Sequence, residues 1–271
     1  MKKYTLRTSH ADIGIRESEG TGMPVLMIHG NSSTGEVFRN QFEGPIGATY
    51  RLIAADLPGH GDSSNAFDPD RSYSMQGYAD ALTEVLAELG IADAAIFGWS
   101  LGGHIALEMI DLYPGMRGLM ITGTPPVAGE DMGKGFRPGP HMDLTGKEHF
   151  TEQDVFDYAS GTCGLPYDEM LHAAVARTDG RARAMMIAKF AQNAGKNQAE
   201  IVARPDTPPI AILNGSNEPY INVEFVDTIP VGNLWGGQKF LIPGSGHAPF
   251  WDAPDQFDPI FKRFLDDIAA A

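Results

Sequence analysis

Short apolar strands alternate with helices along most of the chain, and this alternation constrains the fold more than any other feature. Eight strands are expected, at residues 4–8, 12–17, 25–28, 52–55, 94–97, 119–122, 210–213 and 239–242. Helices are expected at residues 74–89, 101–112 and 257–268. Apolar strands separated by helices are typical of parallel sheets covered on both sides. The sequence therefore predicts an α/β fold, with a mostly parallel eight-stranded sheet and helices on both faces.

The alternation breaks between residues 126 and 205. Residues 129–146 are rich in glycine and proline and are expected to form a mobile loop. Three helices with no strand between them are then expected at 151–160, 167–177 and 181–193. An all-helical insert in a parallel-sheet protein is best placed over the ends of the strands. We therefore expect a helical cap at 126–205 and a catalytic core made of 1–125 and 206–271.

The strongest chemical signal is the segment Gly98-Trp99-Ser100-Leu101-Gly102, which stands between a predicted strand and a predicted helix. In that position the G-x-S-x-G pattern is typical of a nucleophile elbow. The serine lies on a sharp turn that lifts its hydroxyl clear of the sheet, and the small neighbours let strand and helix approach each other. A chance pair of turn glycines is the alternative. We expect Ser100 to be a catalytic nucleophile.

A nucleophilic serine needs a histidine base, and the base needs an acid that orients it. His247 lies in a glycine-lined loop after the last predicted strand, where a sheet enzyme presents catalytic side chains. Glu218 leaves the preceding strand in the same way, and the order Ser100, Glu218, His247 is the one that follows a nucleophile elbow. Asp227 is a rival acid but lies in a predicted helix, and a solvated loop carboxylate is the alternative role for Glu218. We predict a triad of Ser100, His247 and Glu218.

The segment His29-Gly30-Asn31 follows another buried strand and is expected to face the elbow. Acyl transfer needs backbone N–H groups aimed at the oxyanion of the substrate. We assign these donors to the amides of Asn31 and Leu101. The Asn31 side chain has two open roles, because it either binds the substrate or caps the helix expected near Glu36.

Charge and composition argue against several other functions. A formal net charge of −15 disfavours binding to nucleic acid or to anionic membranes, and no apolar run is long enough to span a bilayer. The histidines lack metal-ligand spacing, and no G-x-G-x-x-G follows a strand, so neither a metal nor another cofactor is expected. The single cysteine, Cys163, cannot form an internal disulfide, which makes a cytoplasmic location the simplest expectation. The oligomeric state stays open.

Together these motifs resemble the α/β-hydrolase superfamily over the whole chain. A serine at the elbow argues against epoxide hydrolases and haloalkane dehalogenases, which use aspartate there. A narrower resemblance, to the metal-free N-acyl-homoserine lactonases of this fold, rests on residues 29–33, 98–104, 214–219 and 246–250. In those lactonases the acid of the triad is a glutamate, at the position of Glu218.

This resemblance implies that the chain opens the lactone ring of N-acyl-homoserine lactones, the signals of bacterial quorum sensing. The substrate would be a neutral small molecule. Asn31 and a cap tyrosine, Tyr158 or else Tyr167, would bind it, and we place Trp99 among the substrate-binding residues as well. Two alternatives stay open: a general carboxylesterase for short acyl esters that uses the same triad, and a small-ligand receptor on a hydrolase scaffold.

Two expectations concern the surroundings of the substrate. Flexible apolar side chains of the insert either line the space for the acyl tail or simply pack its helices: Met170, Met185, Met186 and Phe190. His104, one turn into the helix that follows the elbow, is expected to pack on the sheet.

Overall fold

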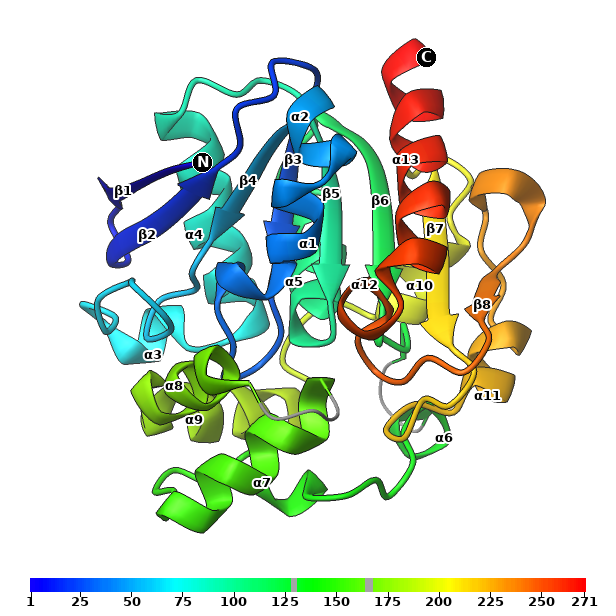
Figure 1. Cartoon of the computed structure of the whole chain (residues 1–271). Coiled ribbons are helices and arrows are strands. Elements are labelled where there is room, and N and C mark those ends of the chain that lie inside the picture. The colour runs from blue at the N-terminus through cyan, green and yellow to red at the C-terminus, as the bar shows by residue number, and fades with distance from the viewer. Residues whose placement is uncertain (128–130, 164–167) are drawn as a thin grey trace.

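One eight-stranded sheet forms the centre of the computed structural model, which describes residues 1–127, 131–163 and 168–271 (Figure 1). The strands are β1 Lys2–Arg7, β2 Asp12–Glu17, β3 Pro24–Ile28, β4 Arg51–Ala55, β5 Ala94–Trp99, β6 Met116–Thr122, β7 Ile210–Gly215 and β8 Phe240–Ile242. Their order across the sheet is β1-β2-β4-β3-β5-β6-β7-β8. β2 pairs antiparallel with β1 and β4, and the later pairs are parallel. The predicted α/β fold is confirmed.

Helices fill the connections between the strands. Those before β6 are η1 Gly35–Phe38, α1 Arg39–Glu43, α2 Pro45–Thr49, α3 Pro69–Ser72, α4 Met75–Glu88 and α5 Leu101–Met109. Those after β6 are α6 Met132–Gly135, η3 Met142–Leu144, α7 Glu152–Cys163, α8 Glu169–Arg177, α9 Gly180–Ala191, α10 Gln198–Ala203, α11 Val223–Thr228, η4 Trp235–Gly237, α12 Pro249–Asp252 and α13 Pro254–Ala270. None of the helices in these described ranges is long and apolar enough to cross a membrane.

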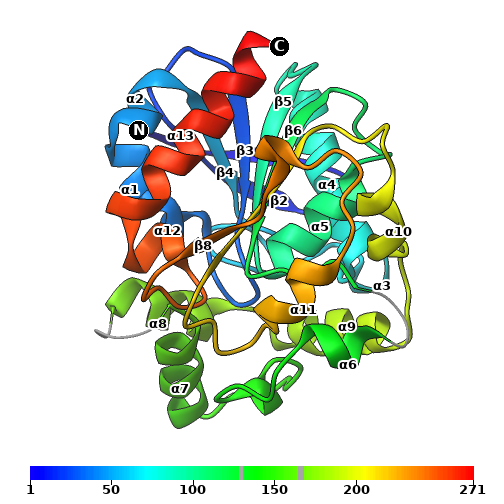
Figure 2. The ribbon, with the colours of Figure 1, turned by 90° about the vertical axis from the view of Figure 1, so that its right-hand side faces the viewer.

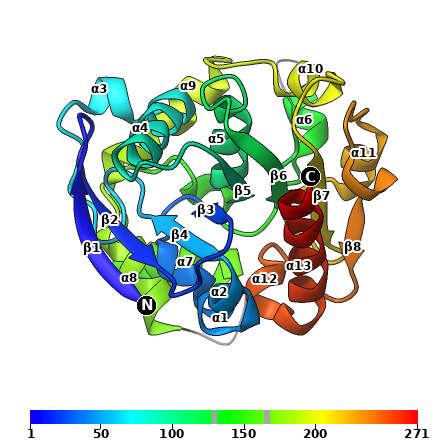
Figure 3. The same cartoon turned by 90° about the horizontal axis from the view of Figure 1, so that it is seen from above.

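Two layers of helices enclose the sheet. Helices α1, α2, α12 and α13 cover one face, and α4, α5 and α10 cover the other (Figures 2 and 3). Because side chains alternate along a strand, successive residues of β3 enter different halves of the core. Met27 belongs to the apolar cluster that includes Phe261 of α13, whereas Leu26 belongs to the one that includes Leu82 of α4. β3 is therefore apolar on both faces, as its sequence suggested.

Helices α7, α8 and α9, in the segment between β6 and β7 here called the β6–β7 insert, lie beyond the carboxyl ends of the parallel strands (Figure 1). The three helices expected there are present as α7, α8 and α9, although the expected start of the second lies outside the described residues. The expectation of a loop without regular structure at 129–146 is wrong for its described part, which contains α6, η3 and a bridge between Phe136 and Ile221. Apolar residues of this part, such as Met132 and Phe136, pack against the core.

Candidate active site

Ser100 stands at the turn between β5 and α5 in a strained backbone conformation. Its φ of 55° and ψ of −120° are unusual for a residue with a side chain. Gly98 and Gly102 permit this turn. A Cβ at Gly98 would lie 2.5 Å from the Gly102 carbonyl oxygen, and one at Gly102 would lie 2.1 Å from that of Ile28. The strand–turn–helix context predicted for the nucleophile is therefore present.

His247 and Glu218 form a buried hydrogen-bonded pair. His247 Nδ1 lies 2.9 Å and 2.8 Å from the two carboxylate oxygens of Glu218, which is 3% exposed. Glu218 Oε1 also accepts a hydrogen bond from the Tyr220 amide at 2.9 Å, which holds the carboxylate in place. Because a carboxylate only accepts, Nδ1 carries the hydrogen and Nε2 of the neutral ring is left as a base.

Ser100 and His247 line one pocket of about 100 Å³, which also contains Asn31 and Tyr158. Within the described residues, the Ser100 hydroxyl makes no hydrogen bond to the imidazole. Catalytic hydrogen bonds often become short only in the substrate complex, so this arrangement suits a nucleophile and its base. Five apolar residues that belong to or pack against one core cluster also line the pocket, and they are here called its apolar end: Met75, Phe136, Met186, Ile187 and Phe190. The pocket thus combines polar reactive groups with apolar side chains.

Two residues that line the pocket have backbone amides without acceptors of their own. In the ranges the structure covers, neither the Asn31 nor the Leu101 amide donates a hydrogen bond. Both residues line the pocket, and Leu101 is the first residue of α5, so the amides suit an oxyanion hole. The Asn31 side chain does not cap the helix near Glu36, because Thr34 takes that position. Asn31 Nδ2 instead donates to the Thr145 carbonyl at 3.0 Å.

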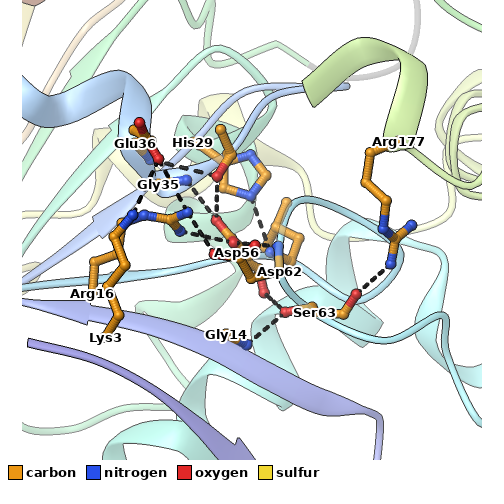
Figure 4. A network of polar contacts seen from close by, with 12 residues as sticks. Lys3, Gly14, Arg16, His29, Gly35, Glu36, Asp56, Asp62, Ser63 and Arg177 are labelled. Atoms are coloured by element: carbon orange, nitrogen blue, oxygen red, sulfur yellow. Dashed lines mark hydrogen bonds and ion pairs between the residues drawn. The ribbon is translucent and has the colours of Figure 1, made fainter. Parts of the chain in front are cut away.

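A buried charged network holds the loop that carries Asn31 (Figure 4). Asp56 accepts hydrogen bonds from the Gly35 amide at 2.6 Å and from Arg16 at 2.8 Å. Burial raises the pKa of Asp56, but Arg16, His29 and backbone amides outweigh burial and bring the pKa below its ordinary value. His29 Nε2 accepts from the Leu57 amide at 3.0 Å, which leaves Nδ1 to donate to the Gly30 carbonyl at 2.8 Å. These bonds fix the backbone beside the predicted oxyanion hole.

Trp99 and Tyr158, both predicted to bind substrate, lie at the pocket in different ways. Trp99 is 1% exposed, and its Nε1 donates to the His247 carbonyl at 2.9 Å, so it also braces the loop of the predicted base. Burial raises the pKa of Tyr158 to about 12, and its hydroxyl lies beside Thr145 and Asn31. Tyr158 therefore presents a neutral hydroxyl next to the Asn31 side chain. Tyr167, the other candidate tyrosine, lies outside the described residues.

Sequence reasoning missed two residues that support the site. The Tyr220 ring packs edge-on against His247, with ring centroids 5.0 Å apart, and its hydroxyl donates to the Gly161 carbonyl at 2.8 Å. Arg183 of α9 is 3% exposed and donates to Ser32 at 3.3 Å and to the Lys147 carbonyl at 3.0 Å. In the sequence, Arg183 is visible only as a charged residue of an amphipathic helix, and that position predicts a side chain in water.

Other expectations are corrected or refined by the structure. His104 does not simply pack on the sheet, because it lines the pocket. Met186 and Phe190 also line the pocket, whereas Met170 and Met185 pack in the core clusters and do not line it. Asp227 lies in α11 and lines a different hollow, away from His247. Within the described ranges, no group of three or more His, Cys, Asp or Glu side chains could hold a metal ion.

Comparisons with known proteins identify the family of this chain. The model of the alpha/beta hydrolase family matches residues 25–259. The solved structure of the N-acyl homoserine lactonase AidH with N-butanoyl homoserine is 57% identical, covers 99% of this chain and 97% of its own, and has a TM-score of 0.97. A mutant of the same lactonase with N-hexanoyl homoserine lactone is also 57% identical, covers 99% of this chain and 98% of its own, and has a TM-score of 0.96.

A curated relative is more distant. The pimeloyl-[acyl-carrier protein] methyl ester esterase of Nitrosospira multiformis is 26% identical over 266 residues, which are 92% of this chain and 96% of that protein. The family match spans most of this chain, and the likeness to the lactonase extends over nearly all of it. This chain belongs to the alpha/beta hydrolase family.

Proposed function

We propose that this chain is a serine hydrolase that opens the lactone ring of N-acyl-homoserine lactones. The observation that carries the proposal is one pocket that holds Ser100 on a strained elbow and His247 paired with Glu218. The substrate class is supported by the 57% identity to a lactonase over nearly the whole chain. In the proposed triad Ser100 is the nucleophile, His247 the base and Glu218 the orienting acid.

The reaction starts when His247 Nε2 takes the proton of Ser100 as the serine oxygen attacks the lactone carbonyl. The amides of Asn31 and Leu101 stabilise the oxyanion, and losing one such donor typically costs roughly 3–4 kcal/mol. His247 then gives the proton to the departing ring oxygen, and a water molecule hydrolyses the acyl-enzyme. Glu218 stabilises the imidazolium while it exists and does not itself become protonated.

Polar groups beside the nucleophile suit the rest of the homoserine lactone. In the proposal, the Asn31 side chain and the Tyr158 hydroxyl bind the polar part of the substrate next to the reactive carbonyl. Trp99 contributes part of the pocket wall beside Gly30, because its ring lies 3.1 Å from where a Cβ of Gly30 would stand. The acyl chain occupies the apolar end of the pocket, beside Met186 and Phe190.

We further propose that residues 126–205 act as a helical cap on a catalytic core of residues 1–125 and 206–271. The position of α7 and α9 beyond the strand ends supports this division (Figure 1). Met186 and Phe190 of α9 share the pocket with Ser100, so the cap would enclose the acyl chain. A cytoplasmic location, supported by the buried free thiol of Cys163, is also part of the proposal.

Ring opening by purified Ser100→Ala protein tests the function. We expect turnover, followed by proton release, to fall at least about 10⁴-fold, because the attacking atom is gone. Ser160→Ala is the matched control, since the buried Ser160 hydroxyl has no hydrogen-bond partner among the described residues and does not line the pocket. Full ring-opening activity of Ser100→Ala would refute the mechanism.

A side-by-side assay separates the lactonase from its rivals. Because a distant relative is an esterase, short-chain p-nitrophenyl esters are the substrates to compare with acyl-homoserine lactones. A higher kcat/KM for the esters would favour a general carboxylesterase with the same triad. Failure of a fluorophosphonate probe to label Ser100 would favour a small-ligand receptor.

A further inference from the structure

His104 is a polar side chain in the apolar end of the pocket that the proposed mechanism does not use. It lies one helical turn after Ser100 on α5 and lines the pocket. Its ring centroid is 5.3 Å from that of Phe190 and 6.1 Å from that of Phe136. A ring with two nitrogen atoms therefore stands among aromatic and aliphatic side chains.

Gln198 of α10 determines which nitrogen of His104 carries the hydrogen. His104 Nδ1 lies 2.7 Å from Gln198 Oε1. The amide nitrogen of Gln198 donates to the His104 carbonyl at 3.4 Å, and a carbonyl only accepts. The amide orientation is thus fixed, and Nδ1 must donate to Oε1. Nε2 is then left as an acceptor.

The free nitrogen is available to a ligand. In the part of the chain that the structure describes, no group donates a hydrogen bond to His104 Nε2, and this atom is not among the fully buried unpaired polar atoms. Burial lowers the pKa of His104 to about 4, so the ring is neutral near pH 7. An unpaired acceptor in an apolar pocket is costly unless a donor reaches it.

We propose that His104 Nε2 accepts a hydrogen bond from a hydroxyl on the acyl chain, so that the enzyme favours N-acyl-homoserine lactones with a hydroxyl on the third acyl carbon. This inference rests on the proposed function. In the substrate, the amide spans about 3.8 Å from the ring carbon on its nitrogen to the second acyl carbon. One further bond leads from that ring carbon to the lactone carbonyl, and another leads from the second to the third acyl carbon, so the third acyl carbon lies about 6 Å from the lactone carbonyl. The four-residue step from Ser100 to His104 rises by about 6 Å along α5.

Three lactones with acyl chains of six carbons test the proposal: N-hexanoyl, N-(3-hydroxyhexanoyl) and N-(3-oxohexanoyl) homoserine lactone. We expect kcat/KM to be about threefold to tenfold higher for the 3-hydroxy than for the unsubstituted compound. The 3-oxo compound should gain nothing, because its added oxygen only accepts. Each enantiomer of the 3-hydroxy compound is measured separately, and the better one is compared.

Two variants identify the residue responsible. His104→Phe keeps a ring against Phe136 and Phe190 but removes the acceptor, and it should abolish the preference for the hydroxyl while still opening the unsubstituted lactone. Met186→Leu is the matched control, and it should shift all three substrates together. If thermal unfolding shows that His104→Phe is not folded, Gln198→Met decides, because freeing Nδ1 lets Nε2 carry the hydrogen and should reduce the preference.

The outcomes separate this inference from the proposed function. Equal kcat/KM values for the hydroxy and unsubstituted lactones, or a preference that survives His104→Phe, would overturn the role of His104 and leave the lactonase intact. A wild-type protein that opens none of the three lactones would overturn both.

Discussion

Replacing Glu218 with glutamine tests whether the carboxylate holds the proton of His247 where the proposed reaction needs it. Glu218 Oε1 accepts from the Tyr220 amide at 2.9 Å, and Oε2 lies 2.8 Å from His247 Nδ1. Glutamine keeps the shape but replaces one acceptor with an NH₂ donor. If the NH₂ faces Nδ1, the ring hydrogen moves to Nε2 and the base is lost. If the NH₂ faces Tyr220, it opposes the backbone N–H of Tyr220, which is also a donor.

The expected effect on turnover is therefore large. Loss of the correct tautomer lowers kcat about 10⁴-fold in a Ser-His-Asp triad. At 1.36 kcal/mol for each tenfold change, this is about 5 kcal/mol of transition-state stabilisation. The free energy of unfolding should fall by only about 1–3 kcal/mol, the cost of one badly paired buried group. Turnover is measured by proton release at saturating lactone, and stability by urea unfolding.

Glu218→Asp is the matched control, because it keeps the negative charge that favours hydrogen on Nδ1. We expect it to retain far more activity than Glu218→Gln, although its carboxylate is one methylene shorter. A Glu218→Gln protein that folds and keeps kcat within tenfold of the wild type would refute the assignment of Glu218 as the orienting acid.

Three further changes test other parts of the structure. Gly102→Ala should lower the free energy of unfolding by about 3 kcal/mol or more in urea titrations, because the Cβ of the new alanine would lie 2.1 Å from the Ile28 carbonyl oxygen. A variant as stable as the wild type would contradict the close approach of α5 to β3. Tyr158→Phe should raise KM about threefold to tenfold with kcat and thermal stability nearly unchanged, and an unchanged KM would remove Tyr158 from the binding site. Asp56→Asn should destabilise the protein most near neutral pH, because the pKa of Asp56 is below its ordinary value in the fold. The stability that the Asp56 carboxylate contributes is complete above about pH 4 and is lost as the pH falls through the folded pKa. A difference in unfolding free energy from the wild type that stays constant down to pH 3 would contradict that role.

Local sequence pattern was enough for much of the fold and for naming the residues proposed as the centre of the site. The parallel strands are apolar on both faces because helices cover both sides, and that composition is visible in the sequence of each strand. Ser100 was identifiable because its turn tolerates only small neighbours, and Gly98 and Gly102 meet that requirement. His247 and Glu218 were predicted from loops that follow strands, since the ends of parallel strands meet at one edge of the sheet. Their hydrogen bond is what the structure adds.

Contacts between distant segments decided the rest, and no local pattern carries them. Helices such as α10 span too few residues to show a helical period, so packing against the core determines them. Arg183 looks like a solvated cation in its own helix, yet bonds to Ser32 and to backbone carbonyls hold it in the interior. His104 was expected to contact the sheet, and only the position of Gln198, 94 residues later, gives it a fixed tautomer and leaves its other nitrogen free. Sequence reports what each segment prefers by itself, whereas burial and hydrogen-bond partners depend on which segments the fold brings together.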